Sequence, residues 1–176
     1  MNKINLIDNS LPLCHATGLY GTLLEGSWAL NRQGNRFYPD NNTRLTKDFT
    51  STSDMELLVE ILKEASNYID MELMEVSEAY ANLYTNETVT TIHTDHWDSD
   101  AITVLYFATP EWEINWGGEI VFFSEDKELE GGFSYRPNRL MIFPSNTPHR
   151  VATVSPSARL PRMSIAIKLV KKGVTG

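Results

Sequence analysis

The chain has 176 residues, 41% of them hydrophobic, and a formal net charge of −8 at pH 7. That size favours one domain with a real core, so we expect residues 1–176 to form a single domain. The charge argues against a general nucleic-acid or membrane-surface binder, because both of these surfaces are anionic and attract proteins with an excess of Lys and Arg.

The sequence shows no signal for export or membrane insertion. Its only cysteine, Cys14, has no second cysteine in the chain to pair with. The N-terminal stretch lacks a basic segment followed by a long apolar run, and no stretch approaches about 18 continuous apolar residues. We therefore expect a cytoplasmic protein that does not span a membrane. The sequence leaves its oligomeric state open.

The N-terminal part of the chain gives weak signals. Residues 19–30 fit either a strand or a short helix. Residues 31–52 are polar and contain the turn signal Pro39-Asp40-Asn41-Asn42, which predicts a long loop. Such a loop is either a solvated connection or a lid over a substrate site.

Residues 53–70 give the clearest helix. Ser53 and Glu56 have the spacing of a capping box, in which each side chain satisfies a free backbone N–H of the first turn. Apolar residues then recur at helical spacing, which predicts one stripe that packs on a sheet. The stripe consists of Met55, Leu58, Val59, Leu62, Ala65 and Ile69.

From residue 72 onward the pattern is typical of β structure, with short runs rich in Val, Ile, Thr, Tyr and Phe between turn residues. We expect a mainly β fold, a double-stranded β-helix (jelly roll) with an N-terminal supporting helix and a core barrel at about residues 78–170. Near its end, Met163 and Ile165 alternate with Ser164 and Ala166, as in a strand with one buried face. The predicted strands are 78–84, 88–93, 101–108, 118–124, 132–135, 139–143, 149–154 and 162–170.

Three residues form a candidate metal site. His93 and Asp95 stand at the end of a predicted strand, where residues two apart project on the same face and reach one point. His149 begins a later predicted strand. Two imidazoles and one carboxylate on one face of a metal leave open the positions that non-haem iron(II) needs for a cosubstrate and O₂. We therefore predict His93, Asp95 and His149 as metal ligands.

Other interpretations of this segment stay open. A His-x-Asp pair is common by chance and also fits a surface histidine beside an acidic loop. His96 and Asp98 have the same spacing but lie further from the strand end. Trp97, in the same loop, is a candidate for contact with a substrate.

Arg162 is the second feature with a chemical interpretation, since it opens an apolar strand after His149. A guanidinium holds a carboxylate through two hydrogen bonds and stays charged at any working pH. The distal carboxylate of 2-oxoglutarate requires such a partner. A strand-end cation without a ligand is the plainer interpretation of Arg162 taken alone.

Several segments, in this order and spacing, resemble the prolyl-4-hydroxylase-type branch of the iron(II)/2-oxoglutarate-dependent dioxygenases. The resemblance implies that His93, Asp95 and His149 bind iron(II) and that Arg162 binds the C5 carboxylate of 2-oxoglutarate. It also implies that Tyr84 and Tyr106 line the cosubstrate pocket, although tyrosines in strands are more often packing residues. The matching segments are 82–84, 93–95, 104–107, 116–123, 140–144, 149–151 and 162–166.

The resemblance implies a hydroxylase that uses O₂, releases succinate and CO₂, and is assayed with ascorbate as reductant. Asp95 favours hydroxylation over halogenation, because halogenases of the family carry a small residue at that position. The expected substrate is a prolyl or other peptidyl residue, with a free amino acid or small metabolite as the alternative. Neither nucleic acid nor membrane is expected as a partner.

Two departures from the family pattern bear on these expectations. Arg162 lies 13 residues after His149, which is further than usual. Arg159 lies nearer, but in a Pro-flanked loop, so we prefer Arg162 as the anchor. The N-terminal half matches no motif of the family, which leaves the substrate open.

Two other functions fit parts of the sequence. A cupin-type metalloenzyme would explain residues 137–149, but its first motif needs His-x-His where this chain has His93-Thr94-Asp95. In a non-catalytic jelly-roll binding protein, His93 and His149 would be incidental. Metal analysis separates the last case from the enzymes.

Overall fold

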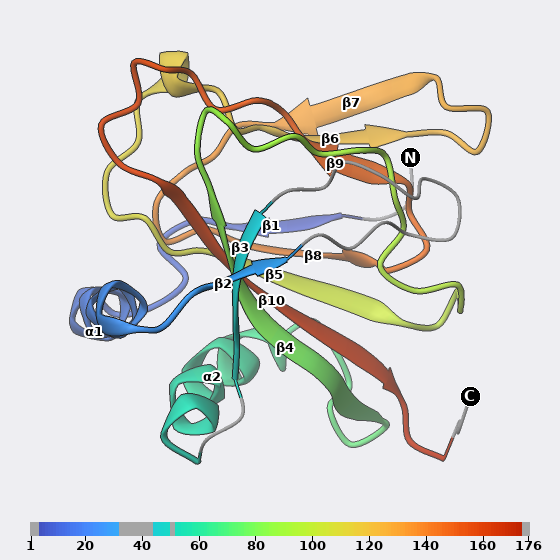
Figure 1. Cartoon of the computed structure of the whole chain (residues 1–176). Helices are drawn as coiled ribbons and strands as arrows, with labels where there is room; N and C mark the ends of the chain where they lie inside the picture. The colour runs from blue at the N-terminus through green and yellow to red at the C-terminus, as the bar shows by residue number, and fades with distance from the viewer. Residues whose placement is uncertain (1–3, 32–43, 50–51, 174–176) are drawn as a thin grey trace.

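The computed structural model describes residues 4–31, 44–49 and 52–173 (Figure 1). Of the helices it describes, none has the length and apolar character needed to cross a membrane. The elements run β1 Asn5–Ile7, α1 Leu13–Glu25, β2 Ala29–Asn31, β3 Arg44–Asp48, α2 Thr52–Ala65, β4 Met74–Tyr84, β5 Ile102–Phe107, the short 3-10 helix η1 Ile114–Trp116, β6 Ile120–Phe123, β7 Leu129–Phe133, β8 Leu140–Pro144, β9 His149–Val151 and β10 Arg162–Lys171.

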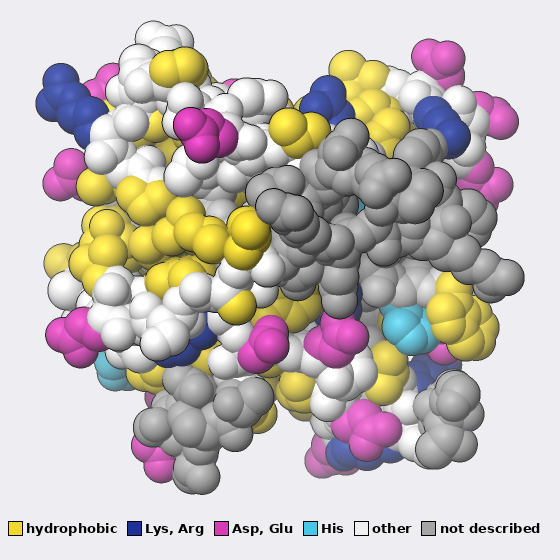
Figure 2. Space-filling view, viewed as in Figure 1, with side chains coloured by type: hydrophobic (Ala, Val, Ile, Leu, Met, Phe, Trp, Pro, Cys, Tyr) yellow, Lys and Arg dark blue, Asp and Glu magenta, His cyan; other side chains and the backbone are white. Residues whose placement is uncertain are grey.

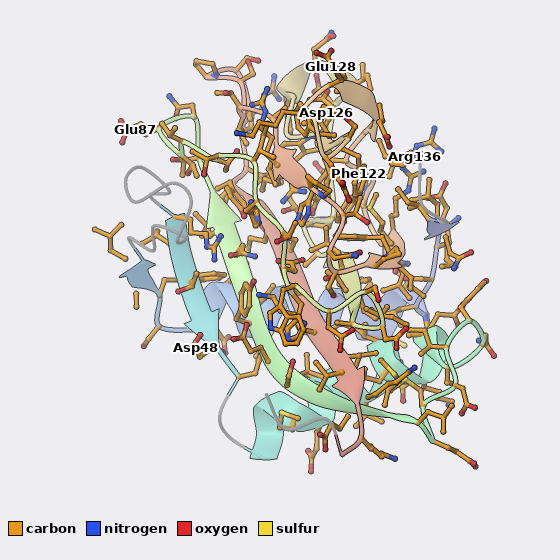
Figure 3. The ribbon with its side chains drawn as sticks, turned by 90° about the vertical axis from the view of Figure 1, so that its right-hand side faces the viewer. Asp48, Glu87, Phe122, Asp126, Glu128 and Arg136 are labelled. Atoms are coloured by element: carbon orange, nitrogen blue, oxygen red, sulfur yellow. The ribbon has the colours of Figure 1, made fainter. Side chains whose placement is uncertain are left out.

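The strands form two antiparallel sheets, as expected for a mainly β jelly roll. The larger sheet has the order β1-β8-β5-β10-β4-β3-β2, and the smaller one has the order β7-β6-β9. Apolar side chains from both sheets form one core between them, in which Phe122 of β6 is fully buried and points inward from the smaller sheet (Figure 3). The two sheets therefore enclose an interior with a wall on each side.

Strand β10 lies between β4 and β5 and sets which residues face this interior. Its register places Arg162 opposite Tyr84 and Ser164 opposite Asn82. Because side chains alternate along a strand, the even-numbered residues of β10 face the smaller sheet and the odd-numbered ones face the other way. Both faces are buried, and Arg162 is completely inaccessible to solvent. The predicted strand is correct, but it has two buried faces where one was expected.

The helices cover the outer face of the larger sheet (Figure 1). Leu19 and Leu23 of α1 pack there with Leu58 and Ile61 of α2, against the odd-numbered residues of β10. The predicted helix therefore does pack on a sheet. The buried side of α2 is rotated from the predicted stripe, since Met55 and Val59 are exposed, whereas Leu58, Ile61 and Ala65 are buried.

Several predicted boundaries differ from the structure. The interval 19–30 contains the end of α1 and then β2, and the predicted loop 31–52 contains β3, while residues 32–43 and 50–51 lie outside the described part. Residues 88–93 form no strand, and His93 makes only an isolated bridge with His149. The helix expected over residues 53–70 ends at Ala65. Its predicted capping box rests on the Ser53 side chain, which also lies outside the described part.

Candidate functional site

His93, Asp95 and His149 come together at one end of the interior between the sheets. Their possible ligand atoms all lie within 4.8 Å of one another. Asp95 Oδ1 is 3.9 Å from His93 Nε2, and Asp95 Oδ2 is 3.7 Å from His149 Nε2. Of the His, Cys, Asp and Glu side chains that the structure describes, these three form the one group of three or more that could hold a metal.

Backbone hydrogen bonds bring the loop with His93 and Asp95 to β9. The amide N–H groups of His93 and His149 each donate to the other residue's carbonyl, at 3.0 and 2.9 Å. The N–H of Asp95 donates to the carbonyl of Ser145 at 2.8 Å. The chain therefore reaches the site without a regular strand before it.

Both imidazoles are oriented in the same way. Nδ1 of His93 lies 2.9 Å from the carbonyl oxygen of Thr91, and Nδ1 of His149 lies 2.9 Å from that of Thr147. A carbonyl only accepts, so each Nδ1 carries the proton and donates it. Each Nε2 is then left with its lone pair toward the centre of the group, which is the tautomer that a metal ligand needs.

Asp95 is held by polar side chains on neighbouring strands. The hydroxyl of Thr103 donates to Asp95 Oδ2 at 2.8 Å and lies 2.8 Å from the hydroxyl of Ser145. Nζ of Lys168, on β10, lies 3.6 Å from Asp95 Oδ1 and 3.0 Å from a carboxylate oxygen of Glu78. These contacts fix the carboxylate in one orientation.

The charges of the group suit a divalent cation. Burial and repulsion from His149 lower the pKa of His93 to about 4. Burial pushes the pKa of Asp95 upward, but His149, Lys168, His93 and the Thr103 hydrogen bond outweigh it and lower that pKa to about 2. At neutral pH, His93 is therefore neutral and Asp95 is ionised, as metal ligands must be.

We expect Thr103→Val to weaken metal binding by about 10-fold or more, because hydrogen-bond partners of a ligand typically contribute 10- to 100-fold. The change keeps the shape of the side chain and removes its hydrogen bond to Asp95. Titration of the metal-free protein with Mn²⁺ measures the affinity. Thr103→Ser keeps the hydroxyl and should bind like the native protein, and equal affinities in all three proteins would contradict a role for this hydrogen bond.

Arg162 lies in the same interior, surrounded by aromatic rings. Its guanidinium carbon is 5.3 Å from the ring centre of Tyr84, 5.2 Å from that of Phe107 and 5.0 Å from that of Tyr135. Its Nε donates to the carbonyl of Gly118 at 2.8 Å. Such a dry, apolar surrounding strengthens the attraction between a guanidinium and a carboxylate.

Gly118 allows the backbone to approach Arg162 this closely. A Cβ atom at position 118 would lie 2.9 Å from Cδ of Arg162, and the backbone φ of +73° also disfavours any other residue. Gly118, which lies in the matching segment 116–123, thus helps to form the arginine site.

Some buried polar atoms of the site have no hydrogen-bond partner among the described residues. Among them are one terminal nitrogen of Arg162 and Oδ1 of Asn82. Both residues line one cavity together with His93, Asp95 and His149. Buried polar atoms normally have partners, so these orphans indicate that a ligand completes the site. Two imidazoles, a carboxylate and a guanidinium with an unsatisfied nitrogen fit a divalent metal with a carboxylate-bearing ligand beside it.

The structure separates the residues predicted for the cosubstrate pocket. Tyr84 lines the cavity, whereas Tyr106 points to the opposite face of β5, packs in the core under the helices and donates its hydroxyl to Asn138 at 3.2 Å. Leu105 takes the inward position next to it. Arg159 is exposed and does not line the cavity, so of the two arginines only Arg162 faces the site.

The alternative His-x-Asp pair lies outside the group. Nδ1 of His96 accepts a hydrogen bond from the N–H of Asp98 at 3.0 Å, which is a local loop contact. Trp97 stacks on His96 and is 77% exposed. It lies on the surface, and its substrate contact remains a prediction.

Four residues around the site were not predicted. Thr103 and Lys168 interrupt apolar strands on the inward face, a signal that the sequence does contain. Tyr135 stacks on Phe107 and donates its hydroxyl hydrogen to the carbonyl of Met163. No motif in the sequence around it predicts that it lies at the site. Arg44 was assigned to a loop and in fact lies on β3.

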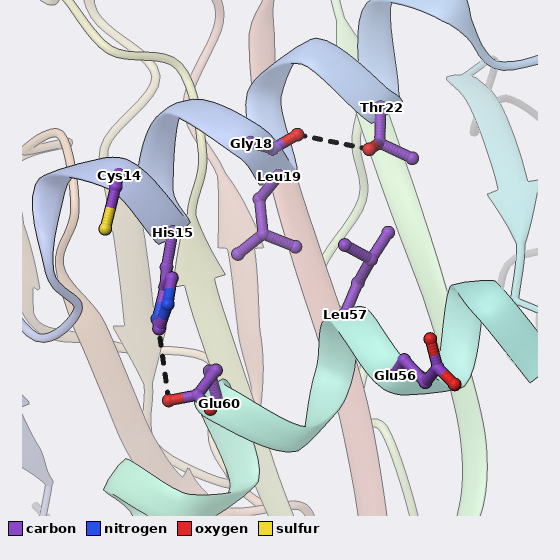
Figure 4. A pocket seen from close by; sticks show the side chains of 8 residues that line it. All are labelled: Cys14, His15, Gly18, Leu19, Thr22, Glu56, Leu57 and Glu60. Carbon is purple, nitrogen blue, oxygen red and sulfur yellow. Dashed lines mark hydrogen bonds and ion pairs between the residues drawn. The ribbon is translucent and has the colours of Figure 1, made fainter.

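A separate pocket lies between the two helices, on the other side of the larger sheet (Figure 4). It has a volume of about 470 Å³, and within it His15 points toward Glu60, with 3.5 Å between Nδ1 and Oε2. The unpaired Cys14 also lines it. None of its lining residues belongs to the group that could hold a metal, so we place the candidate metal site in the interior between the sheets.

Comparison with known proteins identifies relatives of this site and fold. Residues 79–167 match the family model of the 2OG-Fe(II) oxygenase superfamily. No curated protein matches the chain in sequence.

Solved structures share the fold at low identity. A prolyl-4-hydroxylase from Pseudomonas putida superposes with a TM-score of 0.69 at 15% identity, covering 98% of this chain and 94% of its own. A Trichoplax adhaerens prolyl hydroxylase, solved with a hypoxia-inducible-factor peptide, gives 0.67 at 18% identity and covers 96% and 83%. HygX from Streptomyces hygroscopicus, solved with nickel and 2-oxoglutarate, gives 0.71 at 9% identity and covers 99% and 85%.

Proposed function

This chain belongs to the 2OG-Fe(II) oxygenase superfamily, and from that premise we propose that it hydroxylates its substrate at an iron(II) ion held by His93, Asp95 and His149. Members of this family use iron(II), 2-oxoglutarate and O₂. The observation that carries the proposal is the convergence of the three ligand side chains within 4.8 Å, next to a buried arginine with an unsatisfied nitrogen.

Each residue of the site has a distinct task. Nε2 of His93, Nε2 of His149 and a carboxylate oxygen of Asp95 would bind the metal, while Arg162 would bind the distal carboxylate of 2-oxoglutarate. Tyr84 lies against Arg162 and narrows that end of the cavity. The bound metal and cosubstrate supply the oxidation, in which O₂ and 2-oxoglutarate yield succinate, CO₂ and one oxygen atom inserted into a C–H bond of the substrate.

The walls of the cavity protect this chemistry from water. Leu105, Ile120 and Phe143 line it with apolar surface, and Ile120 is almost inaccessible to solvent. Exclusion of water strengthens the interactions of the charged groups inside and limits side reactions of the oxidant.

We propose a prolyl or other peptidyl residue as the substrate, with a free amino acid or small metabolite as the second candidate. Support for the first comes from the prolyl hydroxylases with the same fold. Support for the second comes from HygX, which was also solved with hygromycin B, a small molecule. On the face shown in Figure 2, the described Lys and Arg side chains lie apart from one another.

The test is succinate release by the purified chain with iron(II), ascorbate and 2-oxoglutarate. We expect release that depends on all three of iron(II), 2-oxoglutarate and O₂. Proline-containing peptides and free amino acids are then added, and mass spectrometry detects a product heavier by one oxygen atom. Succinate formed equally well after removal of the metal, or no binding and no turnover of 2-oxoglutarate, would contradict the proposed function.

A further inference from the structure

Arg44 places a second guanidinium in the interior. It is the first residue of β3, and it lines the cavity together with His93, Asp95 and Arg162. Its guanidinium carbon lies 5.7 Å from the ring centre of Tyr80, and the side chain is hydrogen-bonded to that of Tyr84. The arginine therefore lies at the cavity, where it is half-buried.

Arg44 has a hydrogen bond to Tyr84, but its guanidinium is not fully satisfied. Its Nε is buried and has no hydrogen-bond partner among the described residues. No ion pair joins it to a carboxylate in the described part of the chain. Burial lowers its pKa and Tyr84, Tyr80 and Asp95 raise it, with a net increase, so the group is charged. A buried donor atom of a cation is costly to leave without an acceptor, and an anion would supply one.

Lys168 has such partners and Arg44 does not. Both cations lie over the ring of Tyr80, with Nζ of Lys168 at 5.3 Å. Lys168 is neutralised by Glu78 and Asp95, at 3.0 and 3.6 Å. Burial raises the pKa of Tyr80 to about 12, so its phenol is neutral and offers no counter-charge.

The proposed ligands do not remove the charge of Arg44. Of the two carboxylates of 2-oxoglutarate, one would be bound by Arg162 and the other would lie at the metal. The carboxylates of Asp95 and Glu78 lie beside Lys168. Neither carboxylate of the cosubstrate is then left to pair with the charge of Arg44. A third ligand with a single negative charge would neutralise it.

We propose that Arg44 binds a carboxylate of the primary substrate, so that the substrate is an α-amino acid, either free or at the C-terminus of a peptide. This inference rests on the proposed function, because it assigns the remaining ligand of the same site. A guanidinium pairs with a carboxylate through two parallel hydrogen bonds, and Nε is one of the donors in that geometry. Arg44 then determines which substrates bind.

The experiment compares acids with their neutral amides. L-Proline is paired with L-prolinamide, the other proteinogenic amino acids with their amides, and short peptides ending in a free carboxylate with the same peptides amidated. Calorimetry measures binding of each to the oxygen-free complex of the full chain with Mn²⁺ and 2-oxoglutarate. Succinate release above the substrate-free rate, and the mass of the product, identify which of the bound acids are hydroxylated.

We expect at least one acid to bind at least about 30-fold more tightly than its amide, the effect typical of a desolvated charge pair. In Arg44→Gln, binding of that acid should fall to the level of the amide, whereas Arg44→Lys should keep part of the preference. A purely structural role would change acid and amide binding alike. Arg159→Gln, which removes an exposed arginine outside the cavity, should keep the native preference.

Three results would overturn the inference: amides that bind as well as acids, an acid preference that survives in Arg44→Gln, or no binding by any acid of the panel. Free amino acids and C-terminal peptides are distinguished by which set binds. The proposed function fails in a different way, since 2-oxoglutarate would then neither bind nor be converted to succinate even without a substrate.

Discussion

Replacement of His93 by alanine should abolish stoichiometric metal binding and all 2-oxoglutarate-dependent succinate release. The change removes one of only three protein ligands, leaving Asp95 and His149 to hold the ion. Loss of a side chain that hydrogen-bonds to a metal ligand already costs about 10- to 100-fold in affinity, so loss of a ligand itself should cost more than about 100-fold. Metal analysis after loading with iron(II) and desalting, together with the succinate assay, measures both effects.

His93 is a better position for this test than His149. The His149 side chain is only 7% exposed and lies against the rings of Phe122 and Phe143, so its removal would leave a hole in the core. The side chain of His93 is 19% exposed and borders the cavity. A change in thermal unfolding should therefore be small for His93→Ala.

His96→Ala is the matched control, because His96 lies in the same loop but contacts Asp98 and Trp97 and not the metal group. It should bind metal and turn over 2-oxoglutarate like the native chain. If His93→Ala kept a full equivalent of metal and its turnover, the three-residue site would be wrong. Loss of both properties in His96→Ala alone would point to the alternative pair of His96 and Asp98.

The sequence predicted which residues come together at the site better than it predicted the secondary structure that holds them. His93 and Asp95 were expected to project together because they end a strand, but no strand precedes them. The loop is held instead by backbone hydrogen bonds to Ser145 and His149, which are distant in sequence. The spacing of the two residues was informative, whereas the contacts that position them are non-local and leave no periodic pattern.

The phase of β5 shows a limit of pattern analysis. Ile102–Phe107 is apolar at nearly every position, and both of its faces are buried, one under the helices and one against the smaller sheet. Thr103 alone interrupts the apolar run on the inward face, so the segment lacks the regular alternation that would fix its phase. A shift of one residue exchanges the two faces. The resemblance pointed to Tyr106, but Leu105 faces the cavity and Tyr106 the helices.

β10 shows the opposite case. Its small and polar residues Ser164 and Ala166 alternate with Met163 and Ile165, so the phase of the strand could be predicted, and with it that Arg162 shares a face with Ser164 and Ala166. That this face is also buried, against the smaller sheet, could not be predicted, because only the apolar face was expected to be buried. Arg44 could not be placed in this way. It lies in a polar segment that becomes a strand by pairing with β2 on one side and β4 on the other, and the partner residues on β4 are 32 to 38 positions away in the sequence.

Arg162→Gln should weaken 2-oxoglutarate binding by at least about 30-fold, because removing one partner of a buried, hydrogen-bonded charge pair costs about 2–5 kcal/mol. The decisive comparison uses 2-oxopentanoate, which keeps the keto-acid end of 2-oxoglutarate and lacks the distal carboxylate. The native chain should strongly prefer 2-oxoglutarate, and Arg162→Gln should bind both compounds with similar, weak affinity. Calorimetry on the oxygen-free Mn²⁺ complex measures all four affinities.

The difference between the two compounds tests whether Arg162 binds the distal carboxylate of 2-oxoglutarate. Arg162 is fully buried among three aromatic rings, so its replacement also risks a general loosening of the interior. Such loosening would weaken the binding of both compounds equally and preserve the preference for 2-oxoglutarate. Loss of a specific pair between Arg162 and the distal carboxylate would remove that preference. Arg162→Lys should retain part of it, and Arg159→Gln should retain all of it. A preference that survived in Arg162→Gln but disappeared in Arg159→Gln would move the anchor to the exposed arginine and require the loop before β10 to fold over the cavity.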